Sequence, residues 1–448
     1  MKKNSMKNLL GTATLIFVSA CIAFCQTGPR EPVVVAKEFV DLLVKGDFAA
    51  AAKNFDETVS AALPPDKLRE VWTALNAQAG AFQKQLGTQS GQYGALSVVL
   101  VTCQFQRAVI DVKVALDGQR RIAGLWFLPG KPPTPVSTPR YWRTETFQEE
   151  EFVVGSKPWA LPGTLTTPKG DGPWPAVVLV HGSGPNDRDE TVGANKPFKD
   201  LAWGLASQGI AVLRYEKRTK VYAAQIGSLL ANLTVKEEVI DDVLTAVAQL
   251  RVTKRIAPDR IFVLGHSLGG MLIPRIAKLD TNITGFIVLA GATRPLEDMV
   301  LEQTRYLLTL NGNPDDAGKK RLEELSSLVA KIKQLKPSDS SSATRLLGAP
   351  PRYWLDLRGY EPAVVAKGVM RPMLVLQGGR DYQVTQVDFQ GWQKTLATRK
   401  DVTFRLYPGL NHLFVAGKDK GTPAEYDQPG HVAEEVIKDI AEFIERTK

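Results

Sequence analysis

The feature that most constrains the fold of this chain is a serine that lies between glycines, where an apolar run gives way to a helical one. The apolar run Ile261–Leu264 is followed directly by GHSLGG at positions 265–270. A strand that turns sharply into a helix requires small residues on both sides of the turn and exposes the hydroxyl of the serine at its tip. We therefore predict that Ser267 is a nucleophile at a strand-to-helix turn.

Further apolar runs alternate with helical segments on both sides of this serine. The run Ala176–Val180 is continuously apolar, as in a parallel strand buried on both faces. Strands that alternate with helices predict a doubly wound, mostly parallel sheet of the α/β class. The other expected strands are 210–214, 260–265, 285–290, 373–377 and 403–407, with helices at 198–208 and 239–251.

A long helical excursion interrupts this alternation. Roughly eighty charged, helical residues separate the strand ending at Ala290 from the strand starting at Met373. Ordinary connections between neighbouring elements are far shorter. We expect a helical cap over the site at about 295–368. Tyr353 and Trp354, late in this cap, are candidates to line an acyl pocket, with aromatic core packing as the open alternative.

A serine nucleophile needs a base, and the chain has four histidines. His266 precedes Ser267 and would point away from its hydroxyl, and His181 ends a buried strand. His431 lies near the start of an amphipathic C-terminal helix. His412 remains, in a loop after the last expected strand, and the carboxyl end of a sheet is where a base can reach the turn. We predict that His412 is the general base.

The base in turn needs a carboxylate that fixes its tautomer and stabilises its protonated form. Asp381 follows the expected strand 373–377 directly, whereas Asp388 lies deeper in the next helical segment. The resulting chain order of serine, aspartate and histidine is that of α/β-hydrolases, and it differs from the order in chymotrypsin-like and subtilisin-like enzymes. We predict that Asp381 is the third member of the triad.

Two backbone amides are candidates to bind an oxyanion. Leu268 opens the helix after Ser267, where N–H groups have no partner within the helix. The loop HGSGP at 181–185 follows the first buried strand, and its glycines let the backbone approach a substrate. We predict the Ser183 amide as the second donor, with Gly184 as the alternative. The charged runs at 186–189 and 214–218 are expected to be ion-paired scaffolding.

The N-terminus has the layout of an export signal over residues 1–25. Three lysines precede an apolar run, Leu9–Phe24, which ends in small and polar residues. The run is shorter than the ~20 residues that a spanning helix needs. We expect an exported protein, periplasmic or extracellular. The residues before Cys21 also resemble a lipobox, which would leave Cys21 lipidated, although the apolar residues after it make this the weaker alternative.

A small α+β domain is expected at 30–128, followed by a proline-rich linker at 129–144. Helical patterns precede strand patterns, and Asp117-Gly118 predicts a type I′ hairpin turn between two of the strands. The domain resembles the cone-shaped domains found ahead of some bacterial hydrolases. It holds no cluster of histidine, glutamate or cysteine, so we expect packing or a homodimer contact rather than chemistry. Cys103 is expected to be a buried apolar residue.

The charge balance excludes one class of partner. The net charge of +9 comes from 56 basic and 47 acidic residues that are spread along the chain. Nucleic-acid binding needs basic residues gathered in a patch or stripe. We therefore expect no nucleic-acid partner.

The motifs together resemble a known family. Residues 145–448 resemble bacterial α/β-hydrolase carboxylesterases of the EstD type through HGSGPNDRDE, RYEKRT, GHSLGG, GGRDYQV and NHLF, and more distantly the prolyl oligopeptidase-type peptidases. The resemblance implies an α/β-hydrolase fold and hydrolysis of esters with short or medium acyl chains, with Ser267, Asp381 and His412 in the triad positions. One departure is Pro274, which should kink or loosen the helix after Ser267.

We expect acyl transfer to Ser267 followed by hydrolysis by water, which needs no metal or organic cofactor. The partner is then a small-molecule ester. Two alternatives stay open. The same triad could cleave amides in a serine peptidase or amidase of the prolyl oligopeptidase-like type, and a noncatalytic binding module would need no triad at all.

Overall fold

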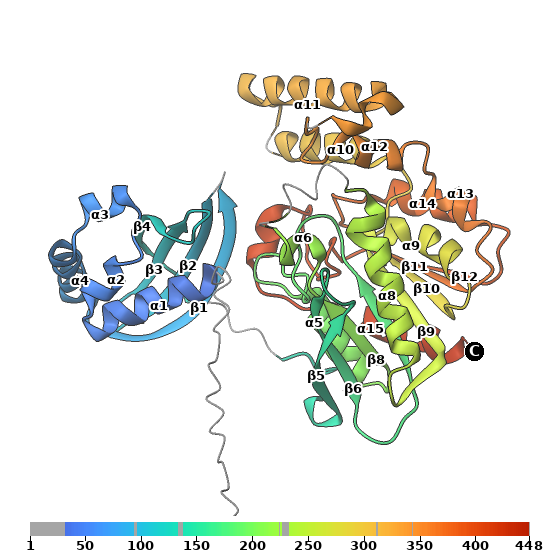
Figure 1. Ribbon diagram of the computed structural model, residues 1–448, viewed down its shortest axis with the longest axis horizontal. Coiled ribbons are helices and arrows are strands. Elements are labelled where there is room, and N and C mark those ends of the chain that lie inside the picture. Colours follow the sequence, from blue (N-terminus) through green and yellow to red (C-terminus); the bar gives the residue numbers. More distant parts are fainter. Residues whose placement is uncertain are drawn as a thin grey trace, which may run out of the picture. The chain divides into compact units, whose positions relative to one another are not determined.

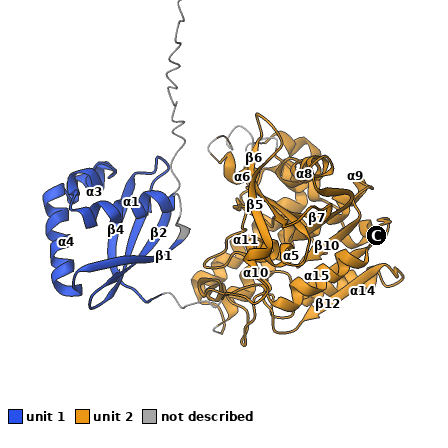
Figure 2. Ribbon diagram, turned by 90° about the horizontal axis from the view of Figure 1, so that it is seen from below, with its two compact units in different colours: residues 1–133 blue, residues 134–448 orange. Residues whose placement is uncertain are grey.

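The computed structural model describes residues 32–93, 96–132, 138–223, 225, 233–310, 312–342 and 344–447. The expected export signal, with Cys21, lies outside these residues, as does part of the expected linker. The chain divides into two compact units, residues 1–133 and 134–448 (Figure 2). Among the described helices, none is both long enough and apolar enough to cross a bilayer.

The first unit packs helices on one face of an antiparallel sheet whose described strands run in the order β1-β2-β3-β4 (Figure 1). Side chains of β2 alternate between buried and partly exposed, and the buried ones include Val99, Val101 and Phe105. They pack against Phe39 and Trp72 of the helices. The elements are α1 (Pro32–Lys45), α2 (Phe48–Ala52), α3 (Glu57–Ala62), α4 (Pro65–Ala79), β1 (Phe82–Tyr93), β2 (Leu96–Phe105), β3 (Val109–Leu116) and β4 (Ile122–Pro129).

Cys103 of β2 is buried in this core, and burial raises the pKa of its thiol to about 12. A thiol that stays protonated is a poor nucleophile. Cys103 therefore contributes packing, as expected from the sequence.

The prediction of a type I′ turn at Asp117-Gly118 is wrong. The hairpin is present, but β3 ends at Leu116 and β4 begins at Ile122, and the residue with a left-handed backbone is Arg120, at φ 63°. The Asp117 carboxylate accepts hydrogen bonds from the N–H groups of Gln119 and Arg121 at 2.8 and 2.9 Å. The aspartate side chain thus holds a longer loop by an Asx-type bond, which the dipeptide signal does not reveal.

The second unit is built on a sheet whose described strands run in the order β12-β11-β10-β9-β7-β8-β6-β5. The strands from β12 to β8 are parallel, while β6 and β5 are antiparallel to their neighbours. The expected α/β fold with a mostly parallel sheet is confirmed. The strands are β5 (Phe147–Val154), β6 (Leu161–Pro168), β7 (Trp174–Val180), β8 (Ala211–Tyr215), β9 (Ile256–His266), β10 (Gly285–Leu289), β11 (Met373–Gly378) and β12 (Val402–Tyr407).

Helices cover both faces of this sheet (Figure 1). Along β7, Val178 belongs to the core on one face while Val177 and Leu179 belong to the core on the other, because successive side chains of a strand point to opposite faces. The first core includes helices α8 (Asp241–Arg251), α9 (Leu268–Leu279) and α14 (Gln386–Thr395), and the second includes α5 (Pro197–Ala206) and α15 (Glu434–Arg446).

Most of the described residues between β10 and β11 are helical. In Figure 1, α10 and α11 lie beside each other at the edge of the second unit. Ile332 of α11 and Trp354 of α12 are buried in the core that also contains α8 and α9. Outside this segment, the other short elements described in the unit are η1 (Thr144–Thr146), α6 (Arg218–Val221), η2 (Lys236–Ile240) and η4 (Pro423–Asp427). The segment contains α10 (Leu296–Thr309), α11 (Asp316–Gln334), η3 (Pro337–Ser341), α12 (Pro351–Leu357) and α13 (Pro362–Ala366).

Candidate active site

Ser267 occupies a strained turn between β9 and α9. Its φ is 55°, in the left-handed region that residues with a side chain rarely adopt. A Cβ on Gly265 would lie 2.3 Å from the carbonyl oxygen of Gly269, and a Cβ on Gly269 would lie 2.3 Å from that of Val180. The flanking glycines are therefore required by close backbone contacts, and the turn presents Ser267 at the carboxyl end of the sheet.

Pro274 lies inside α9, which the structure nevertheless shows as one helix from Leu268 to Leu279. The missing N–H of a proline leaves the carbonyl four residues earlier without its helical partner. That residue is Gly270, in the first turn of the helix. The expected loosening therefore does not divide the helix behind Ser267.

Asp381 and His412 form a buried hydrogen-bonded pair. Nδ1 of His412 lies 2.6 Å from Oδ2 of Asp381. The other carboxylate oxygen accepts from the backbone N–H groups of Gln383 and Val384 at 2.8 and 3.0 Å. With Asp381 as an acceptor, Nδ1 of His412 carries the proton and Nε2 is left free to act as a base.

The loop that carries His412 is fixed by its neighbour Asn411. The side-chain oxygen of Asn411 accepts from the N–H groups of Leu413 and Val415 at 3.0 and 3.1 Å. Its amide nitrogen donates to Glu425 at 3.1 Å. The imidazole is therefore held by a loop that is itself hydrogen-bonded.

Ser267 and His412 line the same cavity of about 190 Å³. Ser183 also lines it, whereas Leu268 follows Ser267 as the first residue of α9, where its amide has no acceptor within the helix. Ser183, Ser267 and His412 thus line one opening, and Asp381 joins them through its hydrogen bond to His412, whereas Leu268 and the two cap aromatics are not among the lining residues. The cavity is lined by Gly182, Ser183, Asn186, Glu190, Val192, His266, Ser267, Tyr382, Gln383, His412, Leu413 and Tyr426.

Gly182, which precedes Ser183, is held on both sides by buried charged side chains. Its N–H donates to Glu190 at 2.5 Å, and its carbonyl accepts from the Lys217 ammonium at 2.7 Å. A Cβ on Gly182 would lie 3.1 Å from the Cβ of Ser267. Any larger residue at position 182 would thus come into tight contact with Ser267.

Glu190 also forms an ion pair with His266, the residue before Ser267. Oε2 of Glu190 lies 2.9 Å from Nδ1 of His266, and Nε2 of His266 lies 2.9 Å from the carbonyl oxygen of His412. Burial alone would lower the pKa of His266 and raise that of Glu190, but their mutual attraction outweighs it. The pKa of His266 is therefore raised and that of Glu190 is lowered.

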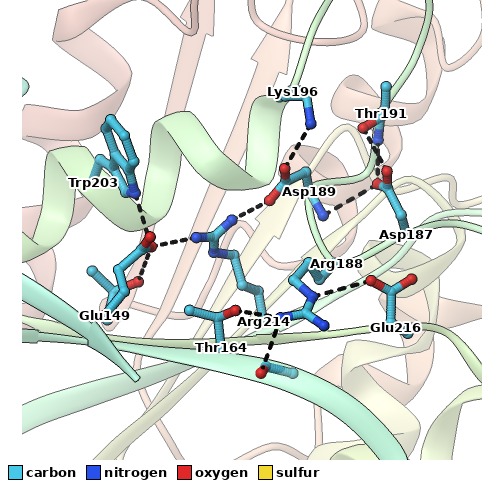
Figure 3. Close-up of polar contacts among 12 residues, drawn as sticks. Glu149, Thr164, Asp187, Arg188, Asp189, Thr191, Lys196, Trp203, Arg214 and Glu216 are labelled. Carbon is cyan, nitrogen blue, oxygen red and sulfur yellow. Dashed lines mark hydrogen bonds and ion pairs between the residues drawn. The ribbon is translucent and has the colours of Figure 1, made fainter. Parts of the chain in front are cut away.

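A network of ion pairs anchors the loop that follows Gly182 (Figure 3). Arg188 pairs with Glu216 at 3.0 Å, and Arg214 pairs with both Asp189 and Glu149. These contacts confirm the expected scaffolding role of the charged runs. They tie the loop to β5 and to β8 with the residues that follow it.

Two sequence families match the chain. The family described as "Serine aminopeptidase, S33" matches residues 173–419, and the family described as "Protein of unknown function (DUF3887)" matches residues 36–125. Esterase EstD from Thermotoga maritima is 40% identical over 407 residues, which cover 91% of this chain and 93% of that protein. The chain belongs to the EstD family of serine hydrolases.

Solved structures with a similar arrangement are more distant from this EstD-type chain. Est1E from Butyrivibrio proteoclasticus is 16% identical with a TM-score of 0.42, over 66% of this chain and 99% of its own. Pyrococcus horikoshii acylaminoacyl peptidase is 16% identical with a TM-score of 0.46, over 83% of this chain and 57% of its own.

The two aromatic residues expected in an acyl pocket do not reach the cavity of this EstD-type site. Tyr353 and Trp354 are buried in the core of the second unit. The Tyr353 hydroxyl donates to Glu238 at 2.8 Å, and the Trp354 indole donates to the Leu346 carbonyl at 2.8 Å. The structure thus gives both residues the core-packing role that the sequence left open as the alternative.

Other aromatic residues line the cavity instead. Tyr382 and Tyr426 both contribute, and their rings stack with centroids 6.4 Å apart. Tyr306 of α10 stacks on the other side of Tyr382 at 5.3 Å. Sequence reasoning missed these tyrosines, although Tyr382 directly follows Asp381 in the EstD-type motif GGRDYQV.

Proposed function

We propose that this chain is a serine carboxylesterase that hydrolyses esters with short to medium acyl chains. The observation that carries the proposal is the hydrogen-bonded Asp381–His412 pair on the cavity that Ser267 lines, at a strand-to-helix turn. Membership of the EstD family supports the ester substrate class.

The mechanism follows from the roles of these groups. Ser267 Oγ attacks the ester carbonyl while His412 Nε2 takes its proton, and Asp381 stabilises the imidazolium. The amides of Ser183 and Leu268 hold the oxyanion, and His412 then gives its proton to the leaving alcohol. Water activated by His412 attacks the acyl-enzyme, which releases the acid and restores the Ser267 hydroxyl.

A serine peptidase or amidase is the second candidate, because the same triad cleaves amides. The match to a family described as serine aminopeptidase favours it. The identity to an esterase over 91% of the chain favours ester hydrolysis more directly, since it extends over both units.

We also propose that the protein is exported, with residues 1–25 as the signal. The support is the pattern of lysines, apolar residues and small residues in the sequence. Lipidation at Cys21 and homodimerisation through the first unit are finer proposals. Mass spectrometry of the mature N-terminus and the molar mass in solution test them.

The function is tested with the signal-free protein and its Ser267→Ala variant. Both are assayed on p-nitrophenyl esters from acetate to laurate, beside aminoacyl and prolyl p-nitroanilides. Ester turnover that Ser267→Ala abolishes is the expected result. Preferential, Ser267-dependent cleavage of the anilides would support the peptidase, and full ester turnover by the variant would remove Ser267 from the mechanism.

A further inference from the structure

A buried lysine lies behind the loop that carries the Ser183 amide. Lys217 is 2% exposed, and its ammonium donates to the carbonyl of Gly182 at 2.7 Å. Glu238 is its counter-ion at 2.7 Å and accepts from the Tyr353 hydroxyl at 2.8 Å. Glu238 lies in the π-helical turn η2 (Lys236–Ile240), and such turns are frequent at functional sites. The mechanism above gives Lys217 no role.

The carbonyl of Gly182 and the N–H of Ser183 belong to the same peptide group. This peptide is trans, since the cis bonds among the described residues precede Pro158 and Pro173. In a trans peptide the C=O and N–H bonds lie in one plane and point in opposite directions. A hydrogen bond that fixes the Gly182 carbonyl therefore also fixes the direction of the Ser183 N–H.

Lys217 does not line the cavity at Ser267, whereas Gly182 and Ser183 do. The bond to Lys217 directs the Gly182 carbonyl toward this buried ammonium. The opposite direction, in which the Ser183 N–H points, leads away from Lys217. An oxyanion donor on the cavity that Gly182 and Ser183 line must likewise point away from Lys217, which is not among the lining residues.

We propose that Lys217 is a positioning residue that orients and polarises the Ser183 amide for binding the oxyanion. The positively charged Lys217 ammonium, bonded to the carbonyl oxygen, draws electron density from the peptide group. This strengthens the N–H of the same peptide as a donor. Donors that are fixed before the reaction stabilise the oxyanion most. Asn186 donates to the same carbonyl at 3.2 Å and supports the same orientation without a charge. This inference rests on the proposed function.

The loop is also held by Glu190, so the effect of Lys217 on the orientation of the Ser183 amide can be separated from its effect on the attachment of the loop. Glu190 holds the N–H of Gly182 at 2.5 Å, one peptide group before the bond to Lys217. Loss of Lys217 therefore leaves the loop attached through Glu190. It removes the shorter, charged hydrogen bond to the Gly182–Ser183 peptide and leaves the 3.2 Å bond from Asn186.

The test replaces Lys217 without leaving a buried charge behind. Lys217→Met combined with Glu238→Gln removes the ammonium and its counter-ion together, and Glu238→Gln alone keeps the lysine. Lys196→Met is the matched control, because Lys196 pairs with Asp189 in the same loop but lies outside the cavity. Each variant is assayed for kcat and KM on p-nitrophenyl butyrate. Each is also titrated with a trifluoromethyl ketone, to which Ser267 adds to form a bound oxyanion.

The double variant is expected to lose about 10- to 100-fold in kcat and in ketone affinity. A misdirected N–H still stabilises the oxyanion in part, so the loss should be smaller than for complete removal of the donor. KM should change by less than about twofold, since the uncharged ester gains little from the amide before attack. Lys196→Met should match the wild type in both readings. Glu238→Gln keeps the Lys217 donor but removes its counter-ion, and it should lose less than the double variant.

A double variant with the kcat and ketone affinity of Lys196→Met would overturn the proposal. A rise in KM with unchanged kcat would also contradict it, because binding of the ground state would then be the affected step. If circular dichroism shows the double variant unfolded, Lys217→Gln with Glu238→Gln replaces it and is judged by the same readings. A wild-type protein that turns over no ester but binds the ketone would contradict the proposed function and leave this comparison intact.

Discussion

The carboxylate of Glu190 lies 2.9 Å from the imidazole of His266, the residue directly before Ser267. The ring of His266 lies 4.6 Å from that of His412 between centroids. A charged imidazolium so close to the proposed base would oppose its protonation. The Glu190 carboxylate, 2.9 Å from His266, opposes that effect.

This pair predicts a pH window for stability. A raised pKa of His266 stabilises the fold fully below the unfolded value of about 6.5, and the contribution is lost as pH rises through the folded pKa. The lowered pKa of Glu190 adds stability above about 4.5, which is lost as pH falls through its folded pKa. Relative to Glu190→Gln with His266→Gln, the free energy of unfolding should fall above pH 6.5 by at most about 1.4 kcal/mol per unit.

Urea unfolding of the wild type and of this double variant at pH 6 and pH 9 measures the effect. His266 faces Glu190, His412 and, through charge, Asp381, so the reference variant must retain the last two. A difference in unfolding free energy that stays constant between the two pH values would refute the charged pair.

His181 predicts the opposite behaviour in acid. Burial, reinforced by the charge of Lys217, lowers the pKa of His181 to about 4, and its Nε2 lies 3.0 Å from the Asp187 carbonyl. In the unfolded chain His181 takes up a proton near pH 6.5, whereas in the folded chain it does so only near pH 4. The free energy of unfolding therefore falls as pH falls from 6.5 to 4. The loss relative to His181→Asn should reach about 3 kcal/mol. Thermal unfolding of both proteins at pH 7 and pH 4.5 tests it, and parallel losses would count against this assignment.

The tyrosines on the cavity predict the chain-length preference. Tyr426 is buried against Tyr382 and accepts from Gln383 at 2.9 Å. Tyr426→Ala should enlarge the cavity and raise the ratio of kcat/KM for hexanoate over butyrate about tenfold, because two buried methylenes are worth about 1.6 kcal/mol. Tyr407→Phe, a tyrosine that bonds Asp439 and lies outside this cavity, is the control. An unchanged ratio in Tyr426→Ala would place the acyl chain elsewhere.

Tyr353 predicts an effect on stability and none on ester binding. Tyr353→Phe removes the hydrogen bond to the buried Glu238 carboxylate and should lower the unfolding free energy by about 1 to 3 kcal/mol. KM for esters from acetate to hexanoate should stay unchanged. A raised KM for the longer esters at unchanged stability would restore the acyl-pocket role that the sequence suggested.

The α/β fold and the placement of Ser267, Asp381 and His412 could be predicted because each depends on a local signal. All three follow a strand of the parallel part of the sheet, and the carboxyl ends of parallel strands meet at one edge of the sheet. Their catalytic roles stay predictions until the variants are assayed.

The supporting residues could not be predicted, because their contacts join distant parts of the chain. Lys217 meets Gly182 only because β7 and β8 are neighbours in the sheet. The edge strand β1 was also missed, since its polar sequence lacks alternation and it is held by its backbone ladder to β2. The sequence left Tyr353 between an acyl pocket and the core, because the packing of a long insertion leaves no periodic signal.

The stacking of Tyr306 on Tyr382 ties the insertion to the loop of Asp381. In engineering terms, the insertion is not an interchangeable module. A chimera that receives the corresponding segment of another hydrolase would lose the aromatic partner of the residue next to Asp381. Shuffling experiments in this family should therefore exchange α10 and the loop after β11 as one inherited unit.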